Sequence, residues 1–424
     1  MLNDGWDERP DREQLMLRSD GRRADTPPLV FTRLGLRAKL LWLPILAVVI
    51  ALAALKGATP ASAAPSSSPI VGHVYIDDNN NSGVNTIGGF DRHADGTLTP
   101  MPGSPFVAGG LGSKTTTISQ GALQLSSDGR FLLAVDRGSN QISVLRIDSD
   151  GSLELVGGGP VSSNGVNPVS VAVHGDLVYA ANAGTPTSSG ETNYTGFTLG
   201  PSGHLRPLAG STVTLPDGSQ LGDVLFSPDG SKLVGTRVGT SLIDSFTVGG
   251  DGLLTAAPGS PFAAQGLGPF GSEFRPTNAA QLYVTNAHNG PLAGTVSAFT
   301  DSADGTLTPI VASPFPDYQT STCWLEITHD GQYLFAVNTG SNSISSYSIA
   351  TDGSLTLLQT TPVSAPTAEP EDARLSPDGT TLWVVDSGGD TVSGFSVDAG
   401  SLTELATSPT PGPAGADPIG IVVT

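Results

Sequence analysis

The feature that most constrains the fold of this chain is an internal repeat. Residues 125–155, 327–357 and 375–405 share one order: an apolar strand, an Asp-Gly turn, an alternating strand ending in Asn or Asp, a further alternating strand, and a Leu-rich strand. An Asp-Gly pair between alternating apolar runs is a strong hairpin signal, because its tight turn needs positive φ angles. Weaker copies occupy residues 168–208, 226–255 and 271–310. Four strands in a unit of about 50 residues predict the blade of a β-propeller.

The two ends of the repeat region predict how the ring closes. The first unit starts at Val71 with a segment that matches the second strand of the other units, so it lacks an innermost strand. The chain ends in residues 418–424, which match the innermost strand that begins at Pro168. We therefore expect an all-β, seven-bladed β-propeller over residues 71–424 with four antiparallel strands per blade. The C-terminal strand, residues 418–424, should complete the first blade and leave the ring without an exposed edge.

The composition agrees with a fold of short strands and tight turns. Gly (54) and Pro (33) are abundant and only 14% of residues are charged, too few to cover many surface helices. A single Cys excludes a disulfide framework and a cysteine-based zinc site. The Asn-rich segment 78–83 resembles the start of a calcium loop, but Gly89 stands where a bidentate Glu is expected, so a turn is the better interpretation. Motifs for catalytic zinc or phosphate cradles are absent, and we expect neither a metal nor a cofactor.

Three segments precede the repeats. They are a charged N-terminal region (1–39), a signal-peptide core with its cleavage region (40–63) and a Pro/Ser linker (64–70). The apolar run 40–55 is short for a membrane span and long enough for a signal peptide, and Ala61-Ser62-Ala63 fits a small-x-small cleavage site. An uncleaved membrane anchor is the alternative. We expect a secreted or extracytoplasmic, cell-surface protein with no membrane contact after cleavage.

The charge is strongly negative beyond the N-terminal segments. After residue 63 the chain has ten Lys/Arg and 32 Asp/Glu, a net charge of −22 with His neutral. So few cations form no basic patch, which excludes nucleic-acid binding and disfavours tight recognition of a multiply charged phosphate ester. The same charge favours solubility and repulsion between copies, so we expect a monomer.

Two segments carry a family resemblance. Residues 282–286, Leu-Tyr-Val-Thr-Asn, and the related 336–345 resemble the YVTN-type repeat. Over 71–424 the chain resembles the seven-bladed lactonase-like propellers, which include bacterial 6-phosphogluconolactonase and fungal carboxymuconate-lactonizing enzymes. The resemblance implies catalysis by His, Glu and Arg at one face of the central channel, with the His at the start of an inner strand. The matching starts here contain no histidine: Gly121-Ala, Pro168-Val, Gly222-Asp, Gly271-Ser, Cys323-Trp and Glu371-Asp.

Carboxylates and arginines on the predicted inner strands are the candidate catalytic groups. An inner strand lines the channel with alternate residues, so several of these groups should converge near the axis. Paired with an arginine, a carboxylate could activate water while the guanidinium polarises a lactone carbonyl, which is general-base ester hydrolysis. The alternative is that acids and arginines solvate a wet channel or pair with each other. The acids are Asp223, Glu273, Glu326, Glu371 and Asp372, and the arginines that could pair with them are Arg237, Arg275 and Arg374.

Two candidates come from the ends of the second strands. Six of these ends are Asp or Asn, whose short side chains accept hydrogen bonds in turns, and Arg237 breaks the series. Arg237 either holds an anionic ligand or pairs with a neighbouring carboxylate. His288 follows one such end, Asn286, and could reach a pocket. Cys323 has no neighbouring His in the sequence and is interpreted as a buried, inert thiol.

Three functions fit these observations. The first is an exported hydrolase of a small, sugar-type lactone, with catalytic residues drawn from Arg237, Glu273, His288, Glu326, Asp372 and Arg374. The second is a non-catalytic extracytoplasmic propeller that binds a carbohydrate-like ligand or a protein partner on one face. The third is a cell-surface structural protein, which would suit an uncleaved anchor.

Overall fold

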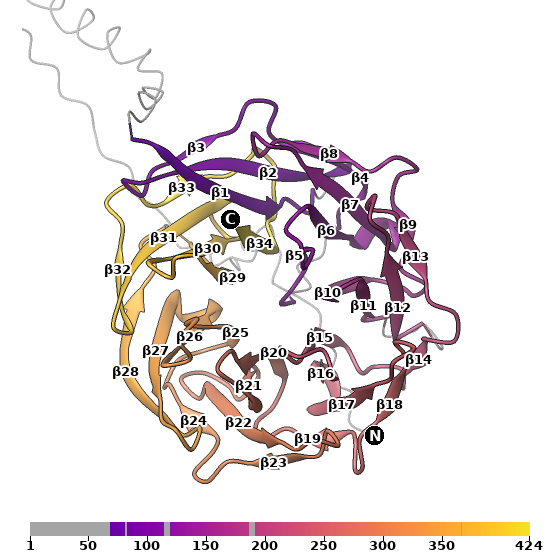
Figure 1. Cartoon of the computed structure of the whole chain (residues 1–424). Helices are drawn as coiled ribbons and strands as arrows, with labels where there is room; N and C mark the ends of the chain where they lie inside the picture. The colour runs from indigo at the N-terminus through magenta and orange to yellow at the C-terminus, as the bar shows by residue number, and fades with distance from the viewer. Residues whose placement is uncertain (1–67, 81–82, 114–118, 186–190, 366) are drawn as a thin grey trace, which may run out of the picture. The chain divides into compact units, whose positions relative to one another are not determined.

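The computed structural model describes residues 68–80, 83–113, 119–185, 191–365 and 367–424. These residues belong to one compact unit, Pro65–Thr424. Within them, seven antiparallel sheets stand as blades around a common axis, and we call the region between their inner strands the channel (Figure 1). The expected charged region, signal segment and first four linker residues lie outside the described residues. No helix within the described ranges is long and apolar enough to span a membrane.

Each blade has an inner, a second, a third and an outer strand, and blades are numbered in chain order. Blade 1 contains β34 (Gly420–Val423), β1 (Ile70–Asp77), β2 (Val84–His93) and β3 (Leu98–Pro100); blade 2 contains β5 (Leu123–Leu125), β6 (Phe131–Asp136), β7 (Gln141–Ile147) and β8 (Leu153–Leu155). Blade 3 contains β10 (Pro168–His174), β11 (Leu177–Asn182), β12 (Asn193–Leu199) and β13 (Leu205–Pro207); blade 4 contains β15 (Leu221–Phe226), β16 (Lys232–Arg237), β17 (Leu242–Val248) and β18 (Leu254–Ala256). Blade 5 contains β20 (Pro269–Arg275), β21 (Asn278–Asn286), β22 (Thr295–Asp301) and β23 (Leu307–Pro309); blade 6 contains β25 (Thr322–Ile327), β26 (Tyr333–Asn338), β27 (Ser343–Ile349) and β28 (Leu355–Pro362); and blade 7 contains β29 (Pro370–Leu375), β30 (Thr381–Asp386), β31 (Thr391–Asp398) and β32 (Ser401–Glu404).

Short return strands pair with the third strand in six of the blades described. They are β4 (Phe106–Leu111), β9 (Val161–Ser162), β14 (Val213–Thr214), β19 (Phe262–Ala263), β24 (Phe315–Pro316) and β33 (Thr410–Pro411). Short 3-10 helices follow three of the second strands: η1 (Arg137–Ser139), η2 (Val238–Thr240) and η3 (Thr339–Ser341).

The ring closes as the sequence predicts. β34 pairs antiparallel with β1, with Val423 opposite Val74 and Gly420 opposite Asp77. Beyond this ladder, the His73 backbone N–H donates to Thr424 O (3.1 Å) and the Thr424 N–H donates to His73 O (2.9 Å). The prediction of a seven-bladed all-β propeller closed by its C-terminal strand is confirmed.

Tyrosines on second strands fasten neighbouring blades together. The hydroxyls of Tyr75, Tyr179 and Tyr283 each donate to a glycine carbonyl in the outer turn of the next blade, at 2.7, 2.8 and 3.1 Å. Each ring is fully buried in the interface between blades, so its hydroxyl needs this partner. The acceptor glycines have positive φ, which explains the recurrent Gly in the second turn of the repeat: Gly151, Gly252 and Gly353.

The Ser-Pro-Phe segments form the connections between blades. The hydroxyls of Ser104, Ser260 and Ser313 accept third-strand backbone N–H groups at 2.9, 3.0 and 2.7 Å. Of the phenylalanines that end these segments, Phe106 and Phe315 are buried and Phe262 is half-buried.

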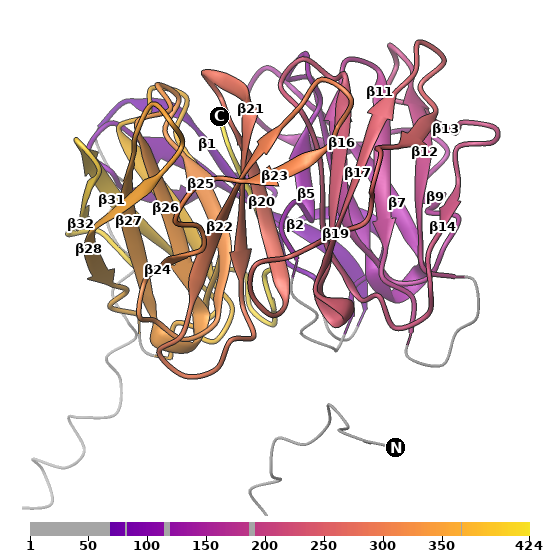
Figure 2. The ribbon, with the colours of Figure 1, turned by 90° about the horizontal axis from the view of Figure 1, so that it is seen from below.

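The strands run between two faces of the ring (Figure 2). The inner strands of blades 2, 4, 6 and 7 end in Asp-Gly turns, and these turns gather on one face, which we call the turn face; residues 126–129 are an example. Loops between second and third strands, such as residues 137–140, lie at the opposite end, the loop face.

Candidate functional site

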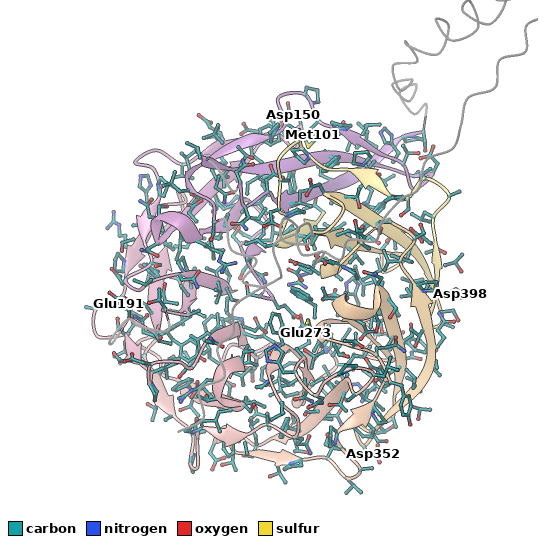
Figure 3. The ribbon with its side chains drawn as sticks, turned by 180° about the vertical axis from the view of Figure 1, so that it is seen from behind. Met101, Asp150, Glu191, Glu273, Asp352 and Asp398 are labelled. Atoms are coloured by element: carbon teal, nitrogen blue, oxygen red, sulfur yellow. The ribbon has the colours of Figure 1, made fainter. Side chains whose placement is uncertain are left out.

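Inner strands of blades 5, 6 and 7 bring three candidate residues to the same height in the channel. Glu273, Glu326 and Arg374 occupy equivalent register positions, opposite Tyr283, Phe335 and Trp383 of their own second strands. Figure 3 shows Glu273 near the middle of the ring.

Arg374 is the centre of this group. Its Nη1 donates to Glu326 Oε2 (3.4 Å), Asp372 Oδ1 (3.1 Å) and the carbonyl of Ala373 (2.8 Å). The other oxygen of Glu326 accepts the Leu375 backbone N–H at 3.1 Å. The side chain of Asp372 is fully buried, whereas those of Glu326 and Arg374 are 12% and 16% exposed.

Asp223 joins the same group from blade 4. Its Oδ2 accepts the backbone N–H and the hydroxyl of Ser272 (3.0 and 2.6 Å), and its Oδ1 accepts the hydroxyl of Ser170 (3.1 Å). One buried carboxylate therefore connects blades 3, 4 and 5 beside the axis. We call Asp223, Glu273, Glu326, Asp372 and Arg374 the channel cluster.

Four carboxyl groups surround one guanidinium in this cluster. Burial raises the pKa of Asp223 to about 7 and also raises those of Asp372 and Glu326. Burial, followed by the charge of Glu326, raises the pKa of Glu273 well above its usual range. Burial opposes the charge of Arg374, but the neighbouring carboxylates outweigh it and raise the pKa of the guanidinium. The arginine therefore stays charged, while the acids exchange protons closer to neutral pH than ordinary carboxyl groups.

Part of Arg374 is open to a ligand. Within the described residues its hydrogen bonds all use Nη1, and none uses Nε or Nη2. The layer toward the loop face, which includes Asp223, Trp324 and Asp372, is buried. Glu273 and Arg374 lie in the next layer toward the turn face, two residues further along their inner strands, and their side chains are partly exposed. Solvent therefore reaches the guanidinium from the turn face.

Four other candidates from the sequence lie outside the channel cluster: Arg237, Arg275, His288 and Glu371, whose Oε1 accepts the Ser387 hydroxyl at 2.7 Å. Arg237 Nε and Nη2 donate to Asp244 Oδ2 and Oδ1 at 2.7 and 2.5 Å, so the guanidinium has the carboxylate partner that the sequence analysis left open. His288 lies in the exposed loop after β21, and partial burial of its ring lowers its pKa. Arg275 donates to the carbonyls of Gly331 and Ala350 (2.8 and 2.9 Å) and pairs with none of the cluster acids.

One residue of the site was missed in the sequence analysis. Gln120, which immediately precedes the predicted start of the blade 2 inner strand, donates from Nε2 to Glu273 Oε1 at 3.4 Å. No local pattern distinguishes it, because its partner is 153 residues away. The interpretation of Cys323 agrees with the structure: the thiol is buried, and burial raises its pKa to about 12.

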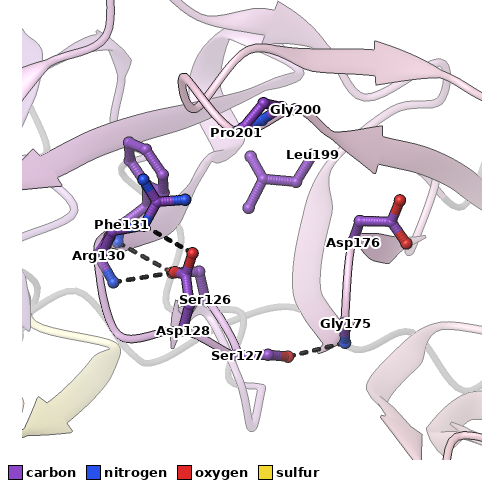
Figure 4. Close-up of a pocket in the computed structure, with 10 residues that line it drawn as sticks. All are labelled: Ser126, Ser127, Asp128, Arg130, Phe131, Gly175, Asp176, Leu199, Gly200 and Pro201. Carbon is purple, nitrogen blue, oxygen red and sulfur yellow. Dashed lines mark hydrogen bonds and ion pairs between the residues drawn. The ribbon is translucent and has the colours of Figure 1, made fainter.

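Shallow hollows also occur outside the channel. One of about 380 Å³ lies between blades 2 and 3, where Arg130 is already paired with Asp128 (2.7 Å) and Ser127 accepts the Gly175 N–H (2.8 Å) (Figure 4). Another of about 400 Å³ includes His73, paired with Asp91 at 3.1 Å. Both hold polar groups whose partners lie within the same hollow, and neither gathers several buried acids around a cation. Among the described residues, no group of three or more His, Cys, Asp or Glu side chains could hold a metal ion.

Comparisons with known proteins agree with this architecture. The family model described as "Lactonase, 7-bladed beta-propeller" matches residues 81–188 and 210–416. A putative 6-phosphogluconolactonase of Bacteroides fragilis is 21% identical with a TM-score of 0.65, over 85% of this chain and all of that one. A putative 6-phosphogluconolactonase of Bacteroides uniformis is 21% identical with a TM-score of 0.66, over 83% of this chain and 99% of that one. The periplasmic gluconolactonase PpgL of Pseudomonas aeruginosa is 18% identical with a TM-score of 0.65, over 83% and 99%. No curated protein matches the sequence.

Proposed function

Because the chain belongs to the family of seven-bladed β-propeller lactonases, we propose that it hydrolyses a small, sugar-type lactone in the channel cluster. The observation that carries the proposal is Arg374, whose Nε and Nη2 are unengaged within the described residues and face solvent beside two acids of raised pKa.

The geometry supports a division of roles. Arg374 would donate to the lactone carbonyl oxygen and stabilise the negative charge that develops there. Glu326 or Glu273, in its ionised form, would take a proton from water as the water oxygen attacks the carbonyl carbon. The ring C–O bond then breaks, and the protonated acid returns the proton to the leaving oxygen. The product is a hydroxy acid.

The charge of the site favours an uncharged substrate. A phosphate group would meet a single guanidinium and four carboxyl groups in the channel cluster. The hydroxyls of a sugar lactone would instead find carboxylate oxygens as acceptors. A 6-phosphogluconolactonase, the description given to two of the similar structures, needs a site for that phosphate.

Export remains part of the proposal. The apolar run 40–55 with the small residues at 61–63 supports it, as does the periplasmic location in the name of the Pseudomonas aeruginosa gluconolactonase. Sequencing the amino terminus of the exported protein tests this: a start at Ala64 fits cleavage, and a start within residues 1–39 fits a retained anchor.

Acid release from a panel of sugar and aliphatic lactones tests the catalytic proposal. The purified full-length chain should produce acid faster than the buffer blank, and Glu326→Gln or Arg374→Gln should reduce this rate. Arg275→Gln is the matched control, because it removes an inner-strand arginine that pairs with no cluster acid. If the wild-type chain hydrolyses none of the lactones in the panel faster than the blank, the proposal is rejected.

One observation favours a non-catalytic ligand-binding propeller as the second candidate. The described inner strands begin without the histidine that the family resemblance leads one to expect; Val169, for example, stands at that position in blade 3. A binding protein would show a rise in Tm with the lactone or its hydroxy acid, and no product would form.

A further inference from the structure

A short segment of blade 2 leaves its sheet and crosses the channel. The inner strand β5 has only three residues, whereas the inner strands of blades 3 to 7 have six or seven. In Figure 1 β5 lies toward the middle of the ring. Residues 119–121 come just before it, and Gly121 has a φ of +77°, which turns the chain away from the sheet.

The backbone of this segment bonds to three other blades. Trp324 Nε1 of blade 6 donates to Ser119 O (3.0 Å), and Gln120 N donates to Gly222 O of blade 4 (3.1 Å). Val171 N of blade 3 donates to Gly121 O (2.9 Å). Ser119 and Gln120 are 0% and 2% exposed, so the segment fills the channel at this height.

The side chain of Gln120 continues across to blades 5 and 6. Its Nε2 donates to Ser272 O (3.0 Å) and to Glu273 Oε1 (3.4 Å), and its Oε1 accepts the Leu325 N–H (3.1 Å). Each polar atom of this buried amide is therefore satisfied. Gly271 leaves the room it needs, because a Cβ there would lie 2.2 Å from Gln120 Oε1.

We propose that Gln120 is a positioning residue of the channel site, which holds Glu273 beside Glu326 and, with Ser119 and Gly121, closes the channel toward the loop face. Substrate and water then enter from the turn face alone. The inference rests on the proposed lactone hydrolysis for its kinetic consequences, but the contact with Glu273 can be tested without turnover.

Two variants remove the donor in different ways. Gln120→Ala removes the side chain, and Gln120→Met keeps its length without its polar atoms, so at least one should fold. We expect kcat to fall on the order of tenfold with little change in KM, since the hydrogen bond that positions Glu273 is lost. The acid limb of the pH profile should move to higher pH, because the ionised form of Glu273 loses a donor.

A buried glutamine at another interface between blades provides the control. Gln281 accepts from Arg275 (2.8 Å) and donates to Thr351 O (3.0 Å), and neither bond reaches an acid of the channel cluster. Gln281→Ala should leave kcat, KM and the pH profile unchanged. Unchanged kinetics and pH profile in both Gln120 variants would overturn the proposal.

Failure of the proposed function would appear separately, as absence of turnover by the wild-type chain. The contact is then tested by carboxyl ¹³C NMR titration of Glu273, with its signal assigned by its loss in Glu273→Gln. A higher Glu273 pKa in Gln120→Met than in the wild type supports the positioning role, and identical titrations overturn it.

Discussion

Arg237 and Asp244 occupy in blade 4 the two positions that hold a hydrogen-bonded Asp/Asn–Ser pair in four other blades. The four pairs, with distances of 2.5, 2.8, 2.9 and 2.6 Å, are Asp136–Ser143, Asn286–Ser297, Asn338–Ser345 and Asp386–Ser393. In blade 4 the guanidinium spans both oxygens of Asp244, which also accepts the Tyr194 hydroxyl (3.0 Å). The arginine at position 237 is thus matched by an aspartate at position 244, and in blade 4 an ion pair replaces the hydrogen-bonded pair of the other blades.

This relationship predicts the effect of separating the pair. Arg237→Ala leaves the carboxylate of Asp244, whose side chain is 2% exposed, without its cation, and should cost roughly 3–5 kcal/mol of unfolding free energy. Arg237→Asn with Asp244→Ser recreates the pair of blade 6 and should recover most of that loss. Denaturant unfolding measures both. A double variant as unstable as the single one would contradict the pairing, and lost turnover in a stable double variant would return Arg237 to the catalytic site.

Buried acids make stability depend on pH. Burial raises the pKa of Asp223 and Asp386 to about 7 and that of Glu371 to about 8. The unfolded chain loses the same protons near pH 4, so between about pH 4 and pH 8 the folded state binds more protons. The free energy of unfolding therefore falls as pH rises through this window, and Tm should be several degrees higher at pH 5 than at pH 8.

A substitution isolates one contribution to this slope. Asp223→Asn should flatten the fall in Tm, because the amide keeps an acceptor for Ser272 and does not titrate. Asp398→Asn, at an exposed position, is the control and should leave the slope unchanged. A Tm that is constant or rises between pH 5 and pH 8 would contradict the protonation of these acids in the folded ring.

Closure of the ring by β34 predicts a strong effect at the C-terminus. Ile421 is fully buried and pairs with Ile76 of β1, so Ile421→Asp should detach β34 and leave β1 as an exposed edge. We expect a large fall in Tm and aggregates on size-exclusion chromatography. Val311→Asp, at a position 87% exposed, should behave as wild type. A chain lacking residues 420–424 that melts like the wild type would disprove closure by this strand.

The sequence predicts the ring and part of the channel because the repeat sets the register. Once the Asp-Gly turns are aligned, Glu326 and Arg374 fall at one height, and the structure places Glu273 of blade 5 at the same height. Long-range contacts could not be predicted in this way. Gln120 bonds to Ser272 and Leu325, which are 152 and 205 residues away, and a local pattern has no information about either.

The rate of neutral aldonolactone hydrolysis at pH 7 tests the central claim most directly. The purified full-length chain should release acid faster than the blank, and Arg374→Gln should lower the rate by on the order of 100-fold, the loss typical of one oxyanion donor. Arg275→Gln should stay near the wild-type rate. A wild-type rate equal to the blank, or an Arg374→Gln rate equal to wild type, would contradict catalysis by the channel cluster.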